Sequence, residues 1–190
     1  MPDTILAPPS SVETPQAVVG LLAELEQRCR DRAYGLPQQK LIQSYWEGVM
    51  FYVGEHRFVA PLSGVKEILN HPSSLTPVPG SKTWMMGVAN VRGTLIPVVD
   101  LQLYLIGMKT RHGRRSRVLV ITLGSGLTGV LVGEMVGMRH FARETARKTQ
   151  FVNDKFSKYV QFEFDQDGMT WPVFSLSALA EDPGFQIAAT

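Results

Sequence analysis

The chain has 190 residues, of which 44% are hydrophobic and 19% charged, and its formal net charge is +2. This composition is that of one good-sized globular domain, or of two small ones that share a core, and it excludes a disordered polyelectrolyte. The charge is too small to argue for nucleic acid by itself. A single cysteine, Cys29, excludes an internal disulfide framework and is typical of a soluble protein of the reducing cytoplasm.

The first 46 residues are expected to stand apart from the rest. Residues 1–16 are rich in Pro, Ser and Thr and lack a basic, apolar leader, so we expect a disordered N-terminus that is not a signal peptide. Residues 17–46 are expected to form a helical extension, because apolar residues in its first part recur at spacings of three and four. This helix either packs on its own domain or docks in a partner's groove, and the sequence leaves both open.

From residue 47 the periodicity changes to that of strands, and we expect one domain over residues 47–182 with a tail at 183–190. Short apolar segments predict strands or single helical turns at residues 49–53, 57–62, 65–69, 81–86, 101–106, 118–123, 127–132, 135–141, 158–164, 169–174 and 175–180. Residues 144–151 are expected to be a short helix or a loop. The polar, basic stretch near 107–117 is expected to be the seam between two halves.

The most informative run is Gly87–Leu101. It predicts two strands, Gly87–Val91 and Thr94–Val99, joined by a tight turn at Arg92-Gly93. Pro97 cannot donate a hydrogen bond to a neighbouring strand, so its strand is expected at a sheet edge or beside a bulge. The run is either simply a well-made hairpin or a device that displays Arg92 to a partner.

Motifs for catalysis, cofactors or metals are weak. Residues Gly124–Gly129 satisfy G-x-G-x-x-G, but a β-rich segment follows where a dinucleotide site needs a helix, so we interpret them as a hairpin turn. The four histidines lack metal-ligand spacing, and no nucleophile elbow or phosphate-loop lysine is present. We therefore expect no enzyme activity, no cofactor and no metal.

The basic stretch Arg111–Arg117 leaves an alternative open. Its four arginines could hold phosphates, which would make the protein a small-barrel nucleic-acid-binding protein. No aromatic residues interleave with them for stacking on bases. A solvated connection, or a patch that steers an acidic protein partner, are the other interpretations.

The run Asn90–Leu101 also carries a resemblance. It satisfies N-[VL]-R-G-x-[LI]-[LIV]-P-[VI]-[VI]-D-L, which resembles the CheW family of chemotaxis adaptor proteins, and a V-x-E-I match at Val65, Glu67 and Ile68 extends it. The likeness covers roughly residues 47–180. It implies a mainly β fold of two SH3-like five-stranded barrels, one for each half, with short helices. It also implies a cytoplasmic, non-enzymatic adaptor that is not inserted in the membrane.

The resemblance further implies partners and contact positions. The partners would be the SH3-like regulatory domain of a CheA-type histidine kinase and the cytoplasmic tip of methyl-accepting chemoreceptors. The receptor tip would enter an apolar groove between the two barrels. Tyr34–Pro37 and the long N-terminal extension resemble the branch of the family associated with type IV pili and twitching motility. We infer that Glu67 and Arg92 pair across the first barrel. The partner-facing positions would be Val65, Glu67, Gly87, Arg92, Leu95, Gly129, Met135 and Met138.

Overall fold

The computed structural model describes residue 27 and residues 45–149 and 153–187. By its internal contacts the chain divides into two units, residues 1–42 and residues 43–190. The expected disordered N-terminus lies outside the described residues, as does all of the helical extension except residues 27, 45 and 46. The second unit contains every strand described below.

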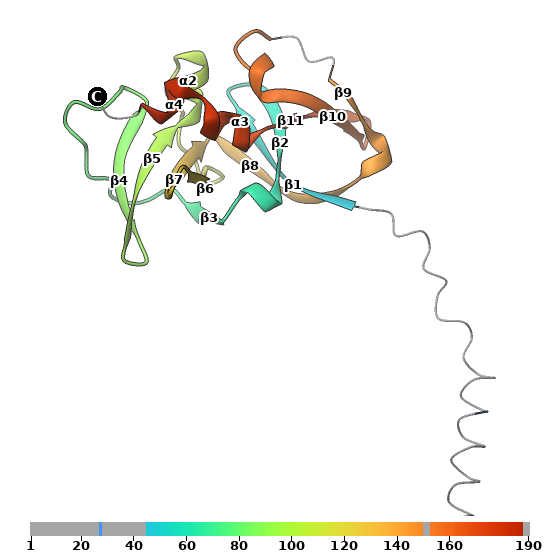
Figure 1. The fold of residues 1–190 in the computed structure, drawn as a ribbon, viewed down its shortest axis with the longest axis horizontal. Helices are drawn as coiled ribbons and strands as arrows, with labels where there is room; N and C mark the ends of the chain where they lie inside the picture. The colour runs from blue at the N-terminus through green and yellow to red at the C-terminus, as the bar shows by residue number, and fades with distance from the viewer. Residues whose placement is uncertain (1–26, 28–44, 150–152, 188–190) are drawn as a thin grey trace, which may run out of the picture. The chain divides into compact units, whose positions relative to one another are not determined.

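The second unit is mainly β, as predicted, and consists of two curled mixed sheets with short helices (Figure 1). One sheet has five strands in the order β3-β6-β7-β5-β4: β3 Glu67–Asn70, β4 Met85–Val91, β5 Thr94–Asp100, β6 Arg117–Leu123 and β7 Gly126–Val132. The other has six in the order β8-β1-β2-β11-β10-β9: β1 Tyr45–Val53, β2 His56–Pro61, β8 Glu134–Ala142, β9 Ala146–Lys148, β10 Val160–Gln166 and β11 Met169–Phe174.

Short helical segments connect these strands. The 3-10 turns are η1 Leu62–Gly64, η2 Arg143–Thr145 and η3 Ser157–Tyr159, and the α-helices are α2 Leu101–Ile106, α3 Leu176–Glu181 and α4 Pro183–Gln186. Asp100 caps α2 and accepts a hydrogen bond from the backbone N–H of Leu103. Within the segment 144–151, expected to be a short helix or a loop, residues 144–145 end η2 and residues 146–148 form β9. Residues 150 and 151 lie outside the described residues. The expected tail begins with α4, whose Phe185 is buried.

The sheets differ from the expectation of one barrel for each half of the chain. The hairpin β1–β2 pairs with β8 and β11, so the first strands belong to the same sheet as the last ones. The segment 107–117 connects α2 to β6 within the five-stranded sheet, so it is not a seam between the sheets. The chain instead crosses between the sheets around η1 and at Gly133. Long-range pairing of this kind leaves no local signal in the sequence.

One further local expectation needs correction, because residues 83–84 form a turn that leads into β4 rather than a helical turn. Of the two alternatives for Pro97, the bulge is the one the structure has. Strand β5 lies between β4 and β7, and the register of the β4–β5 pair shifts between Met85 and Gly87, opposite Val98 and Val99. The parallel pairing of β5 with β7 begins at Val98, one residue after the proline, so no ladder hydrogen bond is lost there. The expected hairpin with its turn at Arg92-Gly93 is confirmed.

The two sheets repeat one plan. In each, an antiparallel hairpin is followed by a capped helix, and its second strand pairs in parallel with another strand: β4, β5 and α2 correspond to β10, β11 and α3. The register shifts at the same place in both hairpins, after Met85 and after Val160. Gly, Pro, Val and Leu recur at the same spacing in Arg92–Leu101 and Asp167–Leu176.

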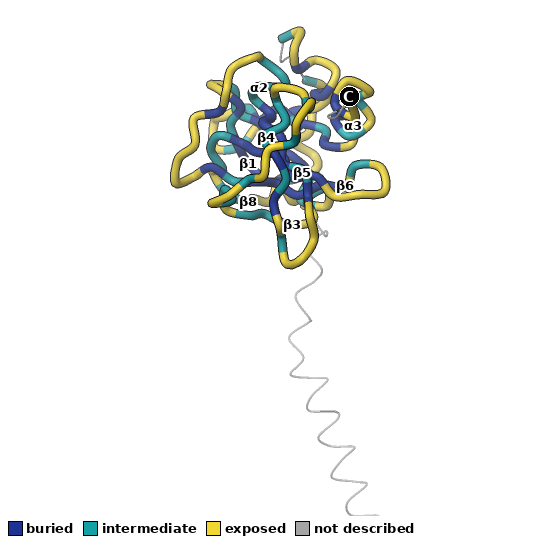
Figure 2. The backbone as a smooth tube through the Cα atoms, turned by 90° about the vertical axis from the view of Figure 1, so that its left-hand side faces the viewer, coloured by how far each residue is buried: buried dark blue, intermediate teal, exposed yellow. Residues whose placement is uncertain are grey.

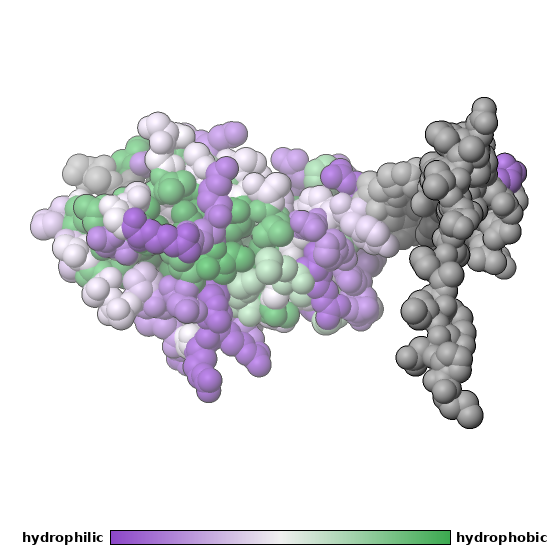
Figure 3. All heavy atoms as spheres, turned by 90° about the horizontal axis from the view of Figure 1, so that it is seen from below, coloured by the Kyte–Doolittle hydropathy of each residue, from purple (hydrophilic) through white to green (hydrophobic). Residues whose placement is uncertain are grey.

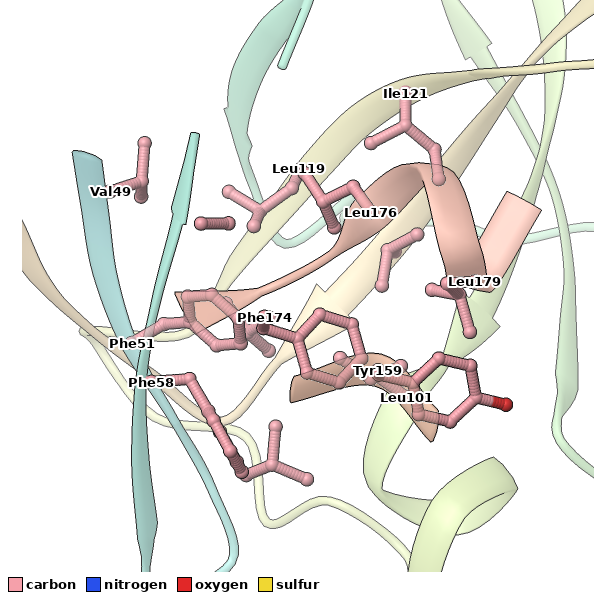
Figure 4. Packing of buried hydrophobic residues seen from close by; sticks show 14 of the residues in the cluster. Val49, Phe51, Phe58, Leu101, Leu119, Ile121, Tyr159, Phe174, Leu176 and Leu179 are labelled. Atoms are coloured by element: carbon pink, nitrogen blue, oxygen red, sulfur yellow. The ribbon is translucent and has the colours of Figure 1, made fainter. Parts of the chain in front are cut away.

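Each sheet encloses a small core of its own, and a larger core lies between them (Figure 4). Strand β6 shows the arrangement, because Val118 and Val120 face the inside of the five-stranded sheet while Leu119 and Ile121 face the shared core. Strands buried on both faces need continuous apolar runs, which explains the composition of residues 118–121. Most buried positions lie on strands, and the hairpin turns are exposed (Figure 2).

A partly buried carboxylate ties the C-terminal helices to both sheets. Asp182, between α3 and α4, accepts hydrogen bonds from the hydroxyls of Tyr104 and Tyr159 and from the Lys158 ammonium group. Tyr104 lies on α2 beside the five-stranded sheet, and Tyr159 ends η3, just before β10 of the six-stranded sheet. Phe185 stacks on Trp84 with ring centroids 5.5 Å apart.

These contacts shift the pKa of each group in the cluster. Burial alone would raise the pKa of Asp182, but hydrogen bonds from Lys158, Tyr104 and Tyr159 hold it well below its ordinary value. Burial, reinforced by the hydrogen bond to the carboxylate, raises the pKa of both tyrosines. Asp182 is therefore ionised and both tyrosines are neutral throughout the physiological pH range.

We predict that Asp182→Asn lowers the free energy of unfolding at neutral pH by about 2 kcal/mol, since hydrogen bonds to a charged acceptor are lost. The native carboxyl has the lower pKa, so its contribution is present above the ordinary carboxyl pKa and is lost as the pH falls through the native value. Urea unfolding should thus show a smaller gap between wild type and variant near pH 3. The exposed Asp154→Asn is the matched control, and a gap that stayed constant with pH would contradict this account.

Candidate partner-binding site

The turn between β4 and β5 holds Arg92 at the surface. Arg92 has φ of 50° and Gly93 has φ of 86°, both in the left-handed region that two-residue hairpin turns require. The side chain of Asn90 accepts a hydrogen bond of 2.8 Å from the Gly93 N–H and fixes the turn. As a result the side chain of Arg92 is 81% exposed.

Arg92 pairs with Glu67, as the sequence led us to infer. The guanidinium Nη2 lies 2.6 Å from Oε1 of Glu67, whose side chain is 28% exposed. Glu67 lies on β3 and Arg92 at the end of β4, and these two strands are the opposite edges of the five-stranded sheet. The ion pair therefore spans the edges of the curled sheet. Because so exposed a pair contributes about 1 kcal/mol or less, its main effect is to orient Arg92.

The edge strands β3 and β8 both border the core that the sheets share. Ile68 on β3 is opposite Leu119, and Met138 on β8 is opposite Val49, where both Leu119 and Val49 belong to that core. Directly opposed residues point to the same face of a sheet. Ile68 is packed on the core, whereas Met138 is 58% exposed at its margin.

Two other expected contact residues, Val65 and Met135, are half-buried and pack on the shared core. Leu95, on β5 next to the Arg92-Gly93 turn, is 70% exposed. A cleft of about 210 Å³ opens between η1, β6 and α3, with Gly64, Lys66, Ile121 and Leu176 in its walls. Seen from below, the molecule shows apolar side chains between hydrophilic ones (Figure 3).

Two of the expected positions are glycines whose surroundings leave no room for a side chain. Gly87 has φ of 141°, and a Cβ there would lie 2.5 Å from the backbone oxygen of Thr76. Thr76 bridges to Val88 and covers the outer edge of β4. A Cβ on Gly129 would lie 2.6 Å from Cγ1 of Val118. Both glycines are explained by close packing of strands.

The second sheet holds a counterpart of the Glu67–Arg92 pair that sequence reasoning missed. Arg139 on the edge strand β8 forms an ion pair with Asp167, at the tip of the β10–β11 hairpin. Asp167 also has a positive φ, 53°, and is followed by Gly168. The charges at the two tips are opposite. The sequence signal for the Asp167 tip is the spacing of Gly, Pro, Val and Leu, which is the same in Arg92–Leu101 and in Asp167–Leu176.

The remaining sequence motifs have plain structural roles. Residues 124–125 form the turn between β6 and β7, and residues 126–129 form the first half of β7. The hairpin interpretation of G-x-G-x-x-G is therefore confirmed. Within residues 45–149 and 153–187 there is no cluster of three or more side chains suited to a metal ion. In the same part of the chain, no helix is long and apolar enough to cross a bilayer.

Comparison with known proteins yields one consistent family. The model of the CheW-like domain matches residues 47–184. The chain is similar to protein PilI of Pseudomonas aeruginosa, with 39% identity over 93% of this chain and 97% of that one. Protein FrzA of Myxococcus xanthus is 37% identical over 47% of this chain and 55% of its own length. The scaffolding protein TtCheW of Thermoanaerobacter tengcongensis shares the fold, with a TM-score of 0.61 and 20% identity over 70% of this chain and 85% of that one. The comparisons give no support to the nucleic-acid-binding alternative.

Gly93 in the hairpin turn and Gly87 in β4 should differ in what they tolerate. We predict that Gly93→Ala lowers the free energy of unfolding by about 1 kcal/mol, the cost of a left-handed residue, because nothing lies within 4 Å of its Cβ position. Gly87→Ala should cost more, because backbone atoms of Thr76 must also move. Urea unfolding of the two variants measures the difference. Equal losses would show that the contact with Thr76 relaxes freely.

Proposed function

This chain belongs to the CheW family, and on that premise we propose that it couples a CheA-type histidine kinase to methyl-accepting chemoreceptors. The proposal makes it a non-enzymatic adaptor that works by holding partners in place. The observation that carries it is the fixed presentation of Arg92 at the surface, on a hairpin braced by Glu67.

The receptor contact is proposed at the border between the two sheets. A receptor tip is a helical hairpin, and helices dock by laying an apolar face into a groove. The exposed Leu95 and Met138 and the half-buried Val65 and Met135 supply apolar surface, while Arg92 and Glu67 supply a charged rim. Gly87 and Gly129 act through the backbone shape of the strands that carry this surface.

The kinase contact is proposed with the kinase's regulatory domain, which in this family has a matching SH3-like fold. A cytoplasmic location beside the receptor arrays follows from such partners. For the output we propose pilus-driven twitching rather than swimming, supported by 39% identity to PilI over nearly the whole of both chains.

The Arg92→Glu variant tests the receptor contact. We expect its affinity for the isolated cytoplasmic tip of a chemoreceptor from the same organism to fall at least about tenfold, because a charge at the rim of the contact is reversed. Calorimetry measures the affinity, and circular dichroism should show an unchanged fold. The matched control is Arg139→Glu, which breaks the corresponding ion pair of the second sheet and should leave receptor binding intact.

A double variant separates recognition from bracing. Glu67→Arg combined with Arg92→Glu restores an ion pair of reversed polarity. If a partner reads the charge of Arg92, the double variant stays defective, whereas recovery of wild-type affinity would show that the pair serves only to shape the hairpin. A folded Arg92→Glu protein that binds the receptor tip normally would refute the proposed contact.

A further inference from the structure

The basic loop 107–117, which the proposed adaptor function does not use, is firmly anchored to the domain. The buried carboxylate of Asp100 accepts hydrogen bonds from the Thr110 N–H at 2.9 Å and from its hydroxyl at 2.6 Å. Near the other end the buried Ser116 hydroxyl donates to the carbonyl of Gly133 at 2.7 Å and accepts from the Gly113 N–H. A segment that is anchored near both ends holds its exposed side chains in fixed positions.

The middle of the loop is anchored as well. The ring of His112 packs on that of His71, which follows β3, with centroids 4.5 Å apart. Gly133, the acceptor for Ser116, is where the chain passes from β7 of one sheet to β8 of the other. The loop is therefore attached to β3 and to the crossover between the two sheets.

Several positively charged side chains of the loop take no part in these anchoring contacts. Arg115 pairs with Glu134, and Arg117 donates to backbone carbonyls of Arg114 and Ser116. Lys109, Arg111 and Arg114 are exposed and, within the described part of the chain, have no acidic partner. An ordered loop with three uncompensated cations is an electrostatic docking surface.

We propose that Lys109, Arg111 and Arg114 form a docking site for an acidic segment of a partner protein, in addition to the proposed adaptor contacts. The exposed Met108 beside them offers an apolar contact to the same segment. Nucleic acid fits less well, because unspecific strand binding relies on aromatic rings that stack on bases, and the ring in this loop, His112, is packed against His71.

The test uses the full-length protein and a fluorescently labelled deca-glutamate peptide, followed by anisotropy at low and at physiological salt. We expect binding that weakens as salt rises, because exposed charges are screened beyond about a Debye length. Arg111→Gln with Arg114→Gln should weaken it about tenfold. The matched control, Arg143→Gln with Lys155→Gln, removes the same net charge from exposed positions elsewhere and should bind like wild type.

Three results would overturn the proposal. The first is the absence of binding by the wild-type protein at low salt. The second is equal weakening in both double variants, which would mean that only net charge matters. The third is displacement of the peptide by polyuridylate at a lower concentration of negative charges than unlabelled poly-glutamate requires. That result would assign the loop to nucleic acid. None of these readouts involves a receptor or a kinase, so the outcome is independent of the adaptor function.

Discussion

Apolar side chains from both sheets bury one another in a single shared core, and the rest of the structure depends on that burial. Phe51 and Phe174 come from one sheet and Leu119 from the other, and Leu176 of α3 closes the space between them (Figure 4). Each sheet alone has only a small core, so neither could be stable with its outer face in water. The shared core thereby sets where β3 and β8 lie, and with them the surface proposed to bind the receptor.

Sequence reasoning recovered what local chemistry determines. The turn at Arg92-Gly93 and the hairpin turn at Gly124–Gly129 are both decided by a few adjacent residues. The Glu67–Arg92 pair was inferred from a family resemblance and is present. The assignment of β1–β2 to the last strands was missed, because pairing between distant strands depends on which faces are buried and not on neighbouring residues. Any binding role of the expected contact positions is likewise a property of partners, which the chain alone does not specify.

The repeated plan of the two sheets gives this small protein two similar but oppositely charged ends. One hairpin tip carries Arg92 paired with an acid on its edge strand, and the other carries Asp167 paired with an arginine. An adaptor has to hold different partners at the same time without exchanging them. In general, opposite charges at equivalent places are one means of discriminating between partners, because a wrong partner brings like charges together. The hydrogen bonds from Tyr104 and Tyr159 to Asp182 hold one sheet in place against the other, so the two hairpin tips keep fixed relative positions.

Reconstitution shows whether the chain bridges a kinase and a receptor. The kinase, the cytoplasmic tip fragment of the receptor and this protein would be mixed and followed by analytical ultracentrifugation. We expect a ternary complex that forms only when this protein is present. Association of kinase and receptor to the same extent without it, or binding of this protein to neither, would rule out a bridging role.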